Sequence, residues 1–376
     1  MACVASCRVS ALSVYEGEDG HAYVRLDSSK CVGCLSCERV CNETRSLRGI
    51  NDLDTSAPYA AWANSAEIRK NATSGGIATA AGKWCIDRGG CMIGSSFDGR
   101  RATHVTVSDV DGLKQLQGSK YVWSNPAPAY REIASHLSSG KVLFVGTGCQ
   151  VAGVLAFFAG HPFSSNLYTI DLICGGVPSD LLMQSFFNSA AQLTSITSFR
   201  SKREYVLKGI VDGQEVVLPY DSLPLSGFRA EQTMRYSCYD CPFAFAHRRS
   251  DITIGDLWGD SAPADQRDSG VSLVVVHSEK GQEILSQAEV SSLAMKWKDV
   301  LPNNRRLVFG KTPRTWLRER LADNYKEMDA STFTRVYSVS SSISRPCGFA
   351  TRLWLHLLRK LYSLRCRITI RSILNK

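Results

Sequence analysis

The sequence lacks any run of about 18 consecutive apolar residues, which is the shortest stretch that a membrane-spanning helix requires. Its N-terminus, MACVASCRVSALSVYEGEDG, also lacks the basic region and apolar core of a secretory signal peptide. We therefore expect a soluble, cytoplasmic protein. Fourteen cysteines in a chain of 376 residues do not suggest a disulfide framework, and they favour metal ligands or buried thiols.

Acidic residues are missing from the C-terminal end. Residues 345–376 contain eight Lys or Arg and no Asp or Glu, and they hold all but one of the nine net positive charges. The rest of the chain is nearly neutral, so nucleic acid is not its expected partner. The tail places leucines at helical spacing opposite basic residues. It is expected either to pack on the body or a partner, or to lie peripherally on the inner face of a membrane.

The length and composition predict three regions. Residues 1–45 form a small, cysteine-dense head with no apolar period long enough for a core, so only bound metal is expected to hold it together. Residues 46–67 are predicted to connect this head to a body over residues 65–325. A serine-rich linker and a basic tail follow in residues 338–376.

Short apolar runs alternate with helical stretches in the body. KVLFVG, NLYTIDLIC, SDITIGDLWG and SLVVVHS are typical of buried strands, and YVLKGIVDGQEVVLPY has a hairpin signal at Asp212-Gly213. IATAAGKWCIDRG, AYREIASHLSSG and SDLLMQSFFNSAAQL are typical of helices. The predicted fold class is α+β or mixed α/β, with a mixed-sheet body and a basic helical tail.

The segment KCVGCLSCERVC has the C-x2-C-x2-C-x3-C spacing of bacterial ferredoxins. In that pattern three cysteines hold one 4Fe–4S cubane and the fourth binds a neighbouring cluster. Zinc would need two well-separated C-x2-C pairs, which Cys31, Cys34 and Cys37 do not supply. The head is therefore predicted to be a ferredoxin-like iron–sulfur domain.

The N-terminal CVASC matches the end of an upstream copy of the same pattern, whose first two cysteines are absent. We predict that Cys7 completes the cluster held by Cys31, Cys34 and Cys37. Cys3 and Cys41 remain as half of a second site or as free thiols.

A second group of cysteines follows the predicted strands. The turn in VLFVGTGCQVAG suggests a dinucleotide fingerprint, but the third glycine is misplaced and we discount it. Cys149 and Cys174 each follow a strand, and Cys238 and Cys241 form a C-x2-C pair. Because strand ends in one sheet lie side by side, these four thiolates could meet at one metal centre, although buried structural cysteines are the alternative.

Several motifs in residues 71–259 resemble, in order, those of the coenzyme F420 hydrogenase/dehydrogenase beta-subunit family: NATSGG, GSKYVWS, VLFVGTGCQVAGV, DLICGGVPSD, FRSK and SCYDCPFAFAHRRSDITIGDLWG. With the head, the resemblance extends to about residue 320. It implies a body that binds FAD and a 4Fe–4S cluster, and archaeal members reduce a deazaflavin. The implied cluster ligands are Cys149, Cys174, Cys238 and Cys241. The family usually has proline at Gly148 and histidine at Gly175, so this chain departs from it near the hydride acceptor.

Candidate flavin contacts occur in three places. Thr73, Ser74, Gly75 and Gly76 precede a helix, where free N–H groups can face a phosphate, although an ordinary helix cap has the same residues. GSKYVWS offers the charge of Lys120 for a phosphate, and Tyr121 or Trp123 for ring stacking. In the third place, Asp256 and Trp258 end a strand; Asp256 could orient Arg248 or Arg249, bind a ribityl chain, or simply cap a turn.

We predict an iron–sulfur flavoprotein oxidoreductase with FAD, one 4Fe–4S cluster in the head and one in the body. Its expected partners are a redox protein, either a ferredoxin or a hydrogenase-like subunit, and a small hydride-accepting molecule. One alternative is an electron-transfer subunit that has no substrate site of its own. Another is a binding module stabilised by zinc.

Overall fold

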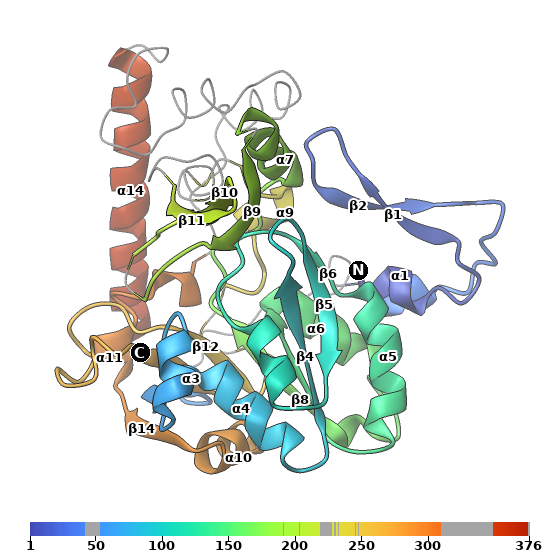
Figure 1. The fold of residues 1–376 in the computed structure, drawn as a ribbon, viewed down its shortest axis with the longest axis horizontal. Coiled ribbons are helices and arrows are strands. Elements are labelled where there is room, and N and C mark those ends of the chain that lie inside the picture. The colour runs from blue at the N-terminus through green and yellow to red at the C-terminus, as the bar shows by residue number, and fades with distance from the viewer. Residues whose placement is uncertain are drawn as a thin grey trace.

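The computed structural model describes residues 1–41, 53–190, 192–202, 204–218, 228, 231, 233–244, 246, 248–309 and 349–374. Its centre is a nine-stranded sheet with the order β14-β3-β13-β12-β8-β7-β4-β5-β6 (Figure 1). The strands are β3 (Ala57–Ala63), β4 (Cys91–Phe97), β5 (Ala102–Val107), β6 (Ser124–Asn125), β7 (Val142–Thr147), β8 (Leu167–Leu172), β12 (Ile252–Asp256), β13 (Ser272–Val276) and β14 (Val290–Ala294). The neighbours β12, β8, β7 and β4 are parallel, whereas β13, β3, β14 and β5 join by antiparallel pairing. The predicted mixed α/β class is confirmed.

Helices cover both faces of this sheet. Successive residues of a strand point to opposite faces, and β7 shows the alternation clearly. Leu143 and Val145 pack with α4 (Ile77–Ile86) and α10 (Glu279–Gln287). Val142 and Phe144 pack with α5 (Ala127–Leu137) and α6 (Gly148–Phe157). The central strands are buried on both sides, which explains why their sequences are continuous apolar runs.

Strand β3 lies between β13 and β14 in the main sheet. The prediction that residues 57–63 belong to a connecting segment is therefore wrong. The sequence APYAAWA has four alanines and no β-branched residue, so its strand signature is weak despite Tyr59 and Trp62. Ala60 and Ala61 are nevertheless fully buried, because small side chains fit between the neighbouring strands and the layers above and below them.

The head consists of α1 (Ala2–Ser6), the hairpin β1 (Leu12–Glu16) and β2 (Ala22–Leu26), and the short α2 (Ser36–Arg39). Figure 1 shows it against the side of the body that carries α5. The expectation that only metal holds this region is wrong. Ala2, Ala5 and Val40 are buried in the same cluster as α5 and α6, so the head shares the apolar core of the body.

The predicted hairpin at Asp212-Gly213 is confirmed. It joins β10 (Lys208–Val211) to β11 (Gln214–Val217), and β9 (Leu193–Ser198) completes a small three-stranded sheet. Asp212 and Gly213 both have positive φ, at 49° and 80°, which is the backbone of a two-residue type I′ turn. The helix α7 (Asp180–Ser189) follows β8 and packs beside this sheet.

The remaining helices are α3 (Ala66–Asn71), α9 (Tyr236–Tyr239), α11 (Trp297–Val300) and α14 (Phe349–Leu374), with 3-10 turns η1 (Asp111–Leu116), η2 (Ser164–Asn166) and η3 (Arg305–Leu307). The predicted serine linker lies outside the described residues. No helix in the described part of the chain combines the length and hydropathy needed to cross a membrane.

Candidate functional site

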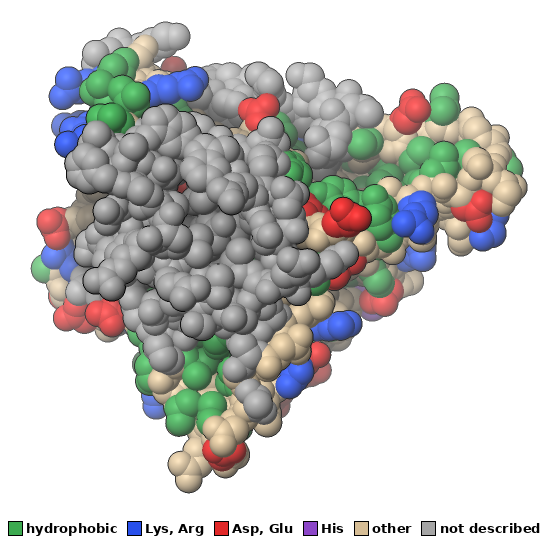
Figure 2. All heavy atoms as spheres, turned by 90° about the horizontal axis from the view of Figure 1, so that it is seen from above, with side chains coloured by type: hydrophobic (Ala, Val, Ile, Leu, Met, Phe, Trp, Pro, Cys, Tyr) green, Lys and Arg blue, Asp and Glu red, His purple; other side chains and the backbone are tan. Residues whose placement is uncertain are grey.

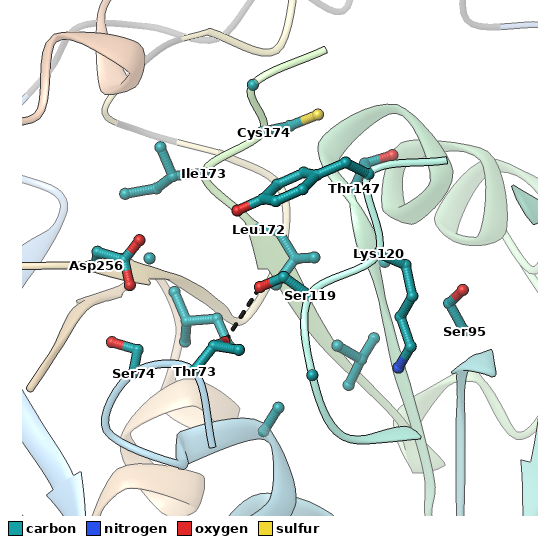
Figure 3. A pocket seen from close by; sticks show the side chains of 18 of the residues that line it. Thr73, Ser74, Ser95, Ser119, Lys120, Thr147, Leu172, Ile173, Cys174 and Asp256 are labelled. Carbon is teal, nitrogen blue, oxygen red and sulfur yellow. Dashed lines mark hydrogen bonds between the residues drawn. The ribbon is translucent and has the colours of Figure 1, made fainter. Parts of the chain in front are cut away.

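A cavity of about 630 Å³ opens where the parallel strands β7, β8 and β12 end (Figure 3). This edge of an α/β sheet is where ligands usually bind, because the loops that follow the strands diverge there. Seven of the eight predicted flavin contacts line the cavity: Thr73, Ser74, Gly76, Lys120, Tyr121, Asp256 and Trp258. Only Gly75 does not, so most of the predicted set is brought to one place.

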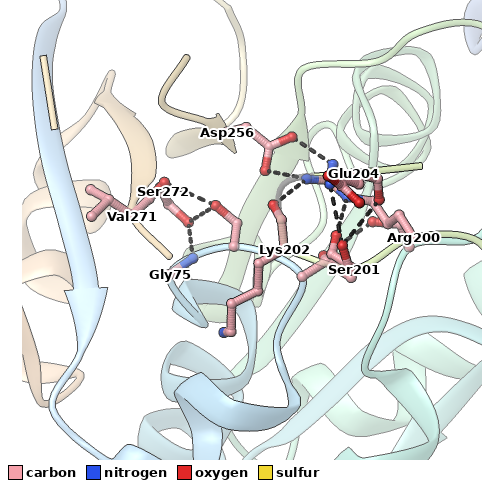
Figure 4. A network of polar contacts seen from close by, with 11 residues as sticks. Gly75, Arg200, Ser201, Lys202, Glu204, Asp256, Val271 and Ser272 are labelled. Atoms are coloured by element: carbon pink, nitrogen blue, oxygen red, sulfur yellow. Dashed lines mark hydrogen bonds and ion pairs between the residues drawn. The ribbon is translucent and has the colours of Figure 1, made fainter. Parts of the chain in front are cut away.

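The turn before α4 is held by a short chain of hydrogen bonds (Figure 4). The Gly75 N–H donates to Ser272 Oγ at 2.9 Å, and Ser272 Oγ donates to Ser74 Oγ at 3.1 Å. A Cβ on Gly75 would lie 2.5 Å from the carbonyl oxygen of Ala61, so only glycine fits there. The Gly75 amide is therefore used within the protein and does not face a phosphate. The Thr73 hydroxyl lies in the cavity, 3.1 Å from Ser119 Oγ.

Asp256 pairs with a residue other than the one expected. Arg200 reaches its two carboxylate oxygens at 2.6 and 3.3 Å, and both residues line the cavity. Burial disfavours the charged guanidinium, but the Asp256 carboxylate outweighs burial and raises the pKa of Arg200. Arg248, one of the predicted partners, instead pairs with the buried Asp171 at 3.2 Å. The Asp256 carboxylate is thus fixed at the cavity wall by a bidentate pair.

A buried cation lies elsewhere in the cavity wall. Lys120 donates to the carbonyl oxygens of Leu116 and Gln117 at 2.7 and 2.8 Å, and burial lowers its pKa to about 8. No Asp or Glu of the described residues pairs with it. Figure 3 shows its side chain on the same side of the cavity as Ser95.

His104 lines the same cavity. Its Nδ1 lies 2.6 Å from Ser124 Oγ, and its ring stacks on Phe144 with 5.6 Å between centroids. Burial, together with the charge of Lys120, lowers the pKa of His104 to about 4, so the ring is neutral at pH 7. Its buried Nε2 has no hydrogen-bond partner among the described residues. A neutral ring nitrogen near an unbalanced cation suits a polar or anionic ligand group.

Aromatic rings border the cavity near Gly175. Tyr121 and Phe228 lie with their centroids 4.2 Å apart and their planes at 30°. A Cβ on Gly175 would come within 2.6 Å of Phe228 Cζ. The space beside this glycine, where the family usually has histidine, is therefore filled by the phenylalanine ring. Trp258 is the most exposed aromatic side chain of the cavity, at 40%.

The four body cysteines are neighbours. Cys149 lies in the first turn of α6, Cys174 follows β8, Cys238 belongs to α9, and Cys241 lies two residues beyond the end of α9. Burial, together with the thiols of the other three cysteines, raises the pKa of Cys241 to about 12. The fold therefore gathers cysteines that are up to 92 positions apart in the sequence.

Donors are already directed at two of these sulfurs. The Gly176 N–H donates to Cys174 Sγ at 3.2 Å, and Thr147 Oγ1 lies 3.2 Å from Cys149 Sγ. Such donors stabilise thiolate ligands and tune the potential of an iron–sulfur cluster. The donor set fits a 4Fe–4S cluster better than structural thiols. Cys85 and Cys91 show the contrast, because burial raises their pKa to about 12 and 11 without a comparable group of neighbours.

The head cysteines are brought together by the β1–β2 hairpin. Leu12 pairs with Leu26, and the Asp27 N–H donates to Ala11 O at 2.8 Å. The chain therefore leaves Cys7 and returns to Cys31 at the same end of the hairpin. The Ala11 N–H donates to Cys7 Sγ at 3.1 Å, a typical contact of a cluster ligand.

The two remaining head cysteines are also neighbours. The thiol of Cys41 contributes to the raised pKa of Cys3, although burial is the larger cause. Helix α1 packs on α2, which joins the two ends of the head. Within the described residues, no three Cys, His, Asp or Glu side chains converge as ligands of a single metal ion. A cubane differs from such an ion because iron and sulfide atoms stand between its cysteine sulfurs.

Four charged or imidazole side chains of the cavity are not predicted from the sequence: His104, Arg200, Glu231 and Arg306, of which the last two form an ion pair. Arg200 stands in FRSK, so its motif is recognisable in the sequence but its role is not. His104 and Ser124 are 20 positions apart, and Glu231 and Arg306 are 75 apart. No local pattern links such pairs.

Two family models match this chain. The model that describes the C-terminal part of the beta subunit of coenzyme F420 hydrogenase/dehydrogenase matches residues 139–298, and the model described as "4Fe-4S dicluster domain" matches residues 1–44. The second match identifies the head as a 4Fe–4S domain and contradicts a zinc module. It covers six cysteines, two fewer than a pair of cubanes needs.

Comparison with curated proteins finds no match. Thirteen chains of solved structures are similar to this one. Among them is a chain from the F420-reducing NiFe hydrogenase complex of Methanosarcina barkeri, with 18% identity and a TM-score of 0.49. The similarity covers 74% of this chain and 91% of that chain.

Proposed function

The chain belongs to the coenzyme F420 hydrogenase/dehydrogenase beta-subunit family, and from this membership we propose that it is a flavin-dependent iron–sulfur oxidoreductase. It exchanges electrons between a redox protein, which docks at the 4Fe–4S head, and a small molecule that accepts or donates hydride. The observation that carries this proposal is the position of Cys174. This residue lines the cavity and also belongs to the group of four body cysteines, so the two sites share a wall.

The residues present fit a flavin. The cavity has the size of a cofactor site, and its walls combine apolar strand residues with many polar and charged side chains. Thr73 and Ser74, in the turn before α4, would bind the pyrophosphate, while Lys120 supplies a positive charge for an anionic group of the cofactor. Tyr121 and Trp258 offer ring faces. The Asp256 carboxylate, held by Arg200, can accept hydrogen bonds from ribityl hydroxyls.

The residues also fit two clusters. In the body Cys149, Cys174, Cys238 and Cys241 would hold a 4Fe–4S cluster, and in the head Cys7, Cys31, Cys34 and Cys37 would hold another. When bound, flavin and clusters supply two-electron hydride chemistry and one-electron transfer, respectively. The protein contributes the thiolates and the N–H donors at Cys7 and Cys174.

The alternative is an electron-transfer subunit that has no substrate site of its own. The cavity favours the first function, because a protein that only conducts electrons needs no pocket of this size beside a cluster. Two properties of the isolated chain distinguish the candidate functions. The oxidoreductase binds FAD and catalyses turnover with an artificial one-electron donor, whereas the electron-transfer subunit does neither.

The test uses the full chain purified without oxygen and supplied with FAD. We expect about one flavin per chain and reduction of that flavin by dithionite-reduced ferredoxin. Cys241→Ser should retain flavin but slow its reduction at least about tenfold, because the connection through the body cluster is lost. Cys91→Ser is the matched control, because this buried thiol begins β4, at the opposite end of the parallel strands from the cavity. A chain that binds no flavin when loaded with iron and sulfide would contradict the proposal and favour the electron-transfer alternative.

A further inference from the structure

Helix α14 carries apolar side chains on two opposite faces. One face packs on the body, where Cys366 and Ile370 are buried and the ring of Tyr362 lies 6.3 Å from that of Phe309. At about 100° per residue, a second apolar set falls on the opposite face. Its members are 48, 61, 51 and 59% exposed: Leu357, Leu361, Leu364 and Ile368. We call these four residues the outer stripe, and the body does not cover them.

Basic side chains border the outer stripe. Lys360, Arg367 and Arg371 lie along one side of it and Arg365 along the other, and all four are exposed. The helix contains no Asp or Glu. Figure 2 shows hydrophobic side chains among Lys and Arg at the corner of the molecule where Figure 1 places α14. A contiguous apolar surface with one sign of charge marks a binding surface rather than an ordinary solvated face.

We propose that the outer stripe of α14 binds the surface of an anionic membrane, with the helix axis in the plane of the headgroups. The four apolar side chains enter the boundary between headgroups and acyl chains, and the bordering cations contact lipid phosphates. The described helices are not apolar enough to span a bilayer, so the contact is peripheral. The stripe extends over about three helical turns, which is enough for a helix to lie flat on a surface.

Charge argues against a second copy of the chain as the occupant. Two copies that paired through this face would place the same four cations opposite each other, with no acidic residue of α14 between them. A lipid surface offers the complement of this pattern, negative at its rim and apolar beneath. The inference does not depend on the proposed redox function, since none of these residues lines the cavity.

The test is sedimentation of the full chain with vesicles of phosphatidylcholine, with or without phosphatidylglycerol. We expect strong binding only to the anionic vesicles, weakened by salt. The double change Lys360→Gln with Arg367→Gln should weaken binding about 25-fold, since each cation near an anionic surface is worth about fivefold. Leu361→Ser with Ile368→Ser should weaken it at least about tenfold.

The matched control changes two exposed apolar residues elsewhere, Val217→Ser and Leu293→Ser, and should bind as the wild type does. Thermal melting checks that each variant folds; because the changed side chains are exposed, the Tm should be unaffected. Equal binding to neutral and anionic vesicles would overturn the proposal. It would also be overturned if the outer-stripe variant bound normally, or if sedimentation velocity showed a dimer that this variant dissociates.

Discussion

At the scale of single residues, the cavity contains groups that are costly without a ligand. Lys120 is buried beside two carbonyl oxygens and has no carboxylate partner among the described residues. The buried Nε2 of His104 also lacks a partner there. Binding sites commonly sacrifice stability in this way, because groups arranged for a ligand are poorly satisfied in its absence.

Lys120→Met should stabilise the ligand-free protein and weaken flavin binding. The pKa of Lys120 is about 8 in the fold and about 10.4 in an unfolded chain, so burial of its charge costs roughly 3 kcal/mol at pH 7. Loss of its two hydrogen bonds offsets part of the gain, which leaves about 1 kcal/mol. Flavin affinity should fall at least about tenfold. Thermal melting and flavin fluorescence titration measure the two effects.

The pH dependence gives a separate check on Lys120. Between pH 8 and 10 the unfolded chain binds more protons at this residue than the native protein does, so the stability of the wild type rises with pH in this window. Flavin binding should weaken over the same window as the cation is lost. Lys120→Met should show neither trend. Parallel pH profiles for the two proteins would contradict a role for this charge.

Gly75→Ala should destabilise the protein by about 2 kcal/mol. Its Cβ would meet the backbone of Ala61 and Ser272 at 2.5 and 2.8 Å, and backbone atoms of a buried sheet cannot yield easily. Gly94→Ala is the matched control, because its nearest contact would be 3.4 Å, to a side chain. Urea unfolding compares the two. Equal midpoints would show that the turn before α4 is less constrained than described.

At the scale of elements, the sequence predicts the central strands but not β3. Strands β7, β8, β12 and β13 are Val- and Ile-rich runs, so hydropathy alone identifies them. Strand β3 is built mainly from alanine, and its place in the sheet depends on pairing with residues more than 200 positions away. The run Cys31, Cys34 and Cys37 was predictable because its spacing is local, whereas the body cysteines lie up to 92 positions apart and only their places after strands and in a C-x2-C pair suggested a common site. The Arg200–Asp256 pair was not predictable, because nothing in the sequence links positions 56 apart.

The contact between the head hairpin and α7 should depend on pH. The Asp180 N–H donates to Gly20 O at 3.0 Å, and burial, with a smaller contribution from Glu16, raises the pKa of the Asp180 carboxyl to about 7. The native protein therefore binds more protons than the unfolded chain between pH 4 and 7, so stability falls as pH rises through this window. The change should be about 4 kcal/mol.

Asp180→Asn removes this titration and keeps the backbone hydrogen bond. The variant should lose the fall in Tm between pH 4 and 7, and hydrogen exchange in β1 and β2, corrected for the intrinsic rate, should become independent of pH. Asp87→Asn, on an exposed ion pair with Lys83, is the control and should behave as the wild type does. If hydrogen exchange in the wild-type hairpin were the same at pH 4 and at pH 7, after correction for the intrinsic rate, the prediction would be refuted.

At the scale of the whole molecule, head and body are joined by a shared core rather than by a linker alone. Ala2 and Ala5 pack against α5 and α6, and α6 begins at the Gly148-Cys149 turn. The head cysteines are therefore connected through one helix to the body cysteines, and these in turn to the cavity through Cys174. The sequence of head cysteines, body cysteines and cavity suits the transfer of electrons between the head and the cavity.

The central claim is that thiolates of this chain hold two 4Fe–4S clusters, one in the head and one in the body. The most direct test is the iron and acid-labile sulfide content of the full chain, purified without oxygen, beside Cys34→Ser and Cys241→Ser. We predict about eight iron atoms per wild-type chain and about four in each variant. A wild type with about four iron atoms, unchanged by Cys241→Ser, would contradict the body cluster and with it the proposed route to the cavity.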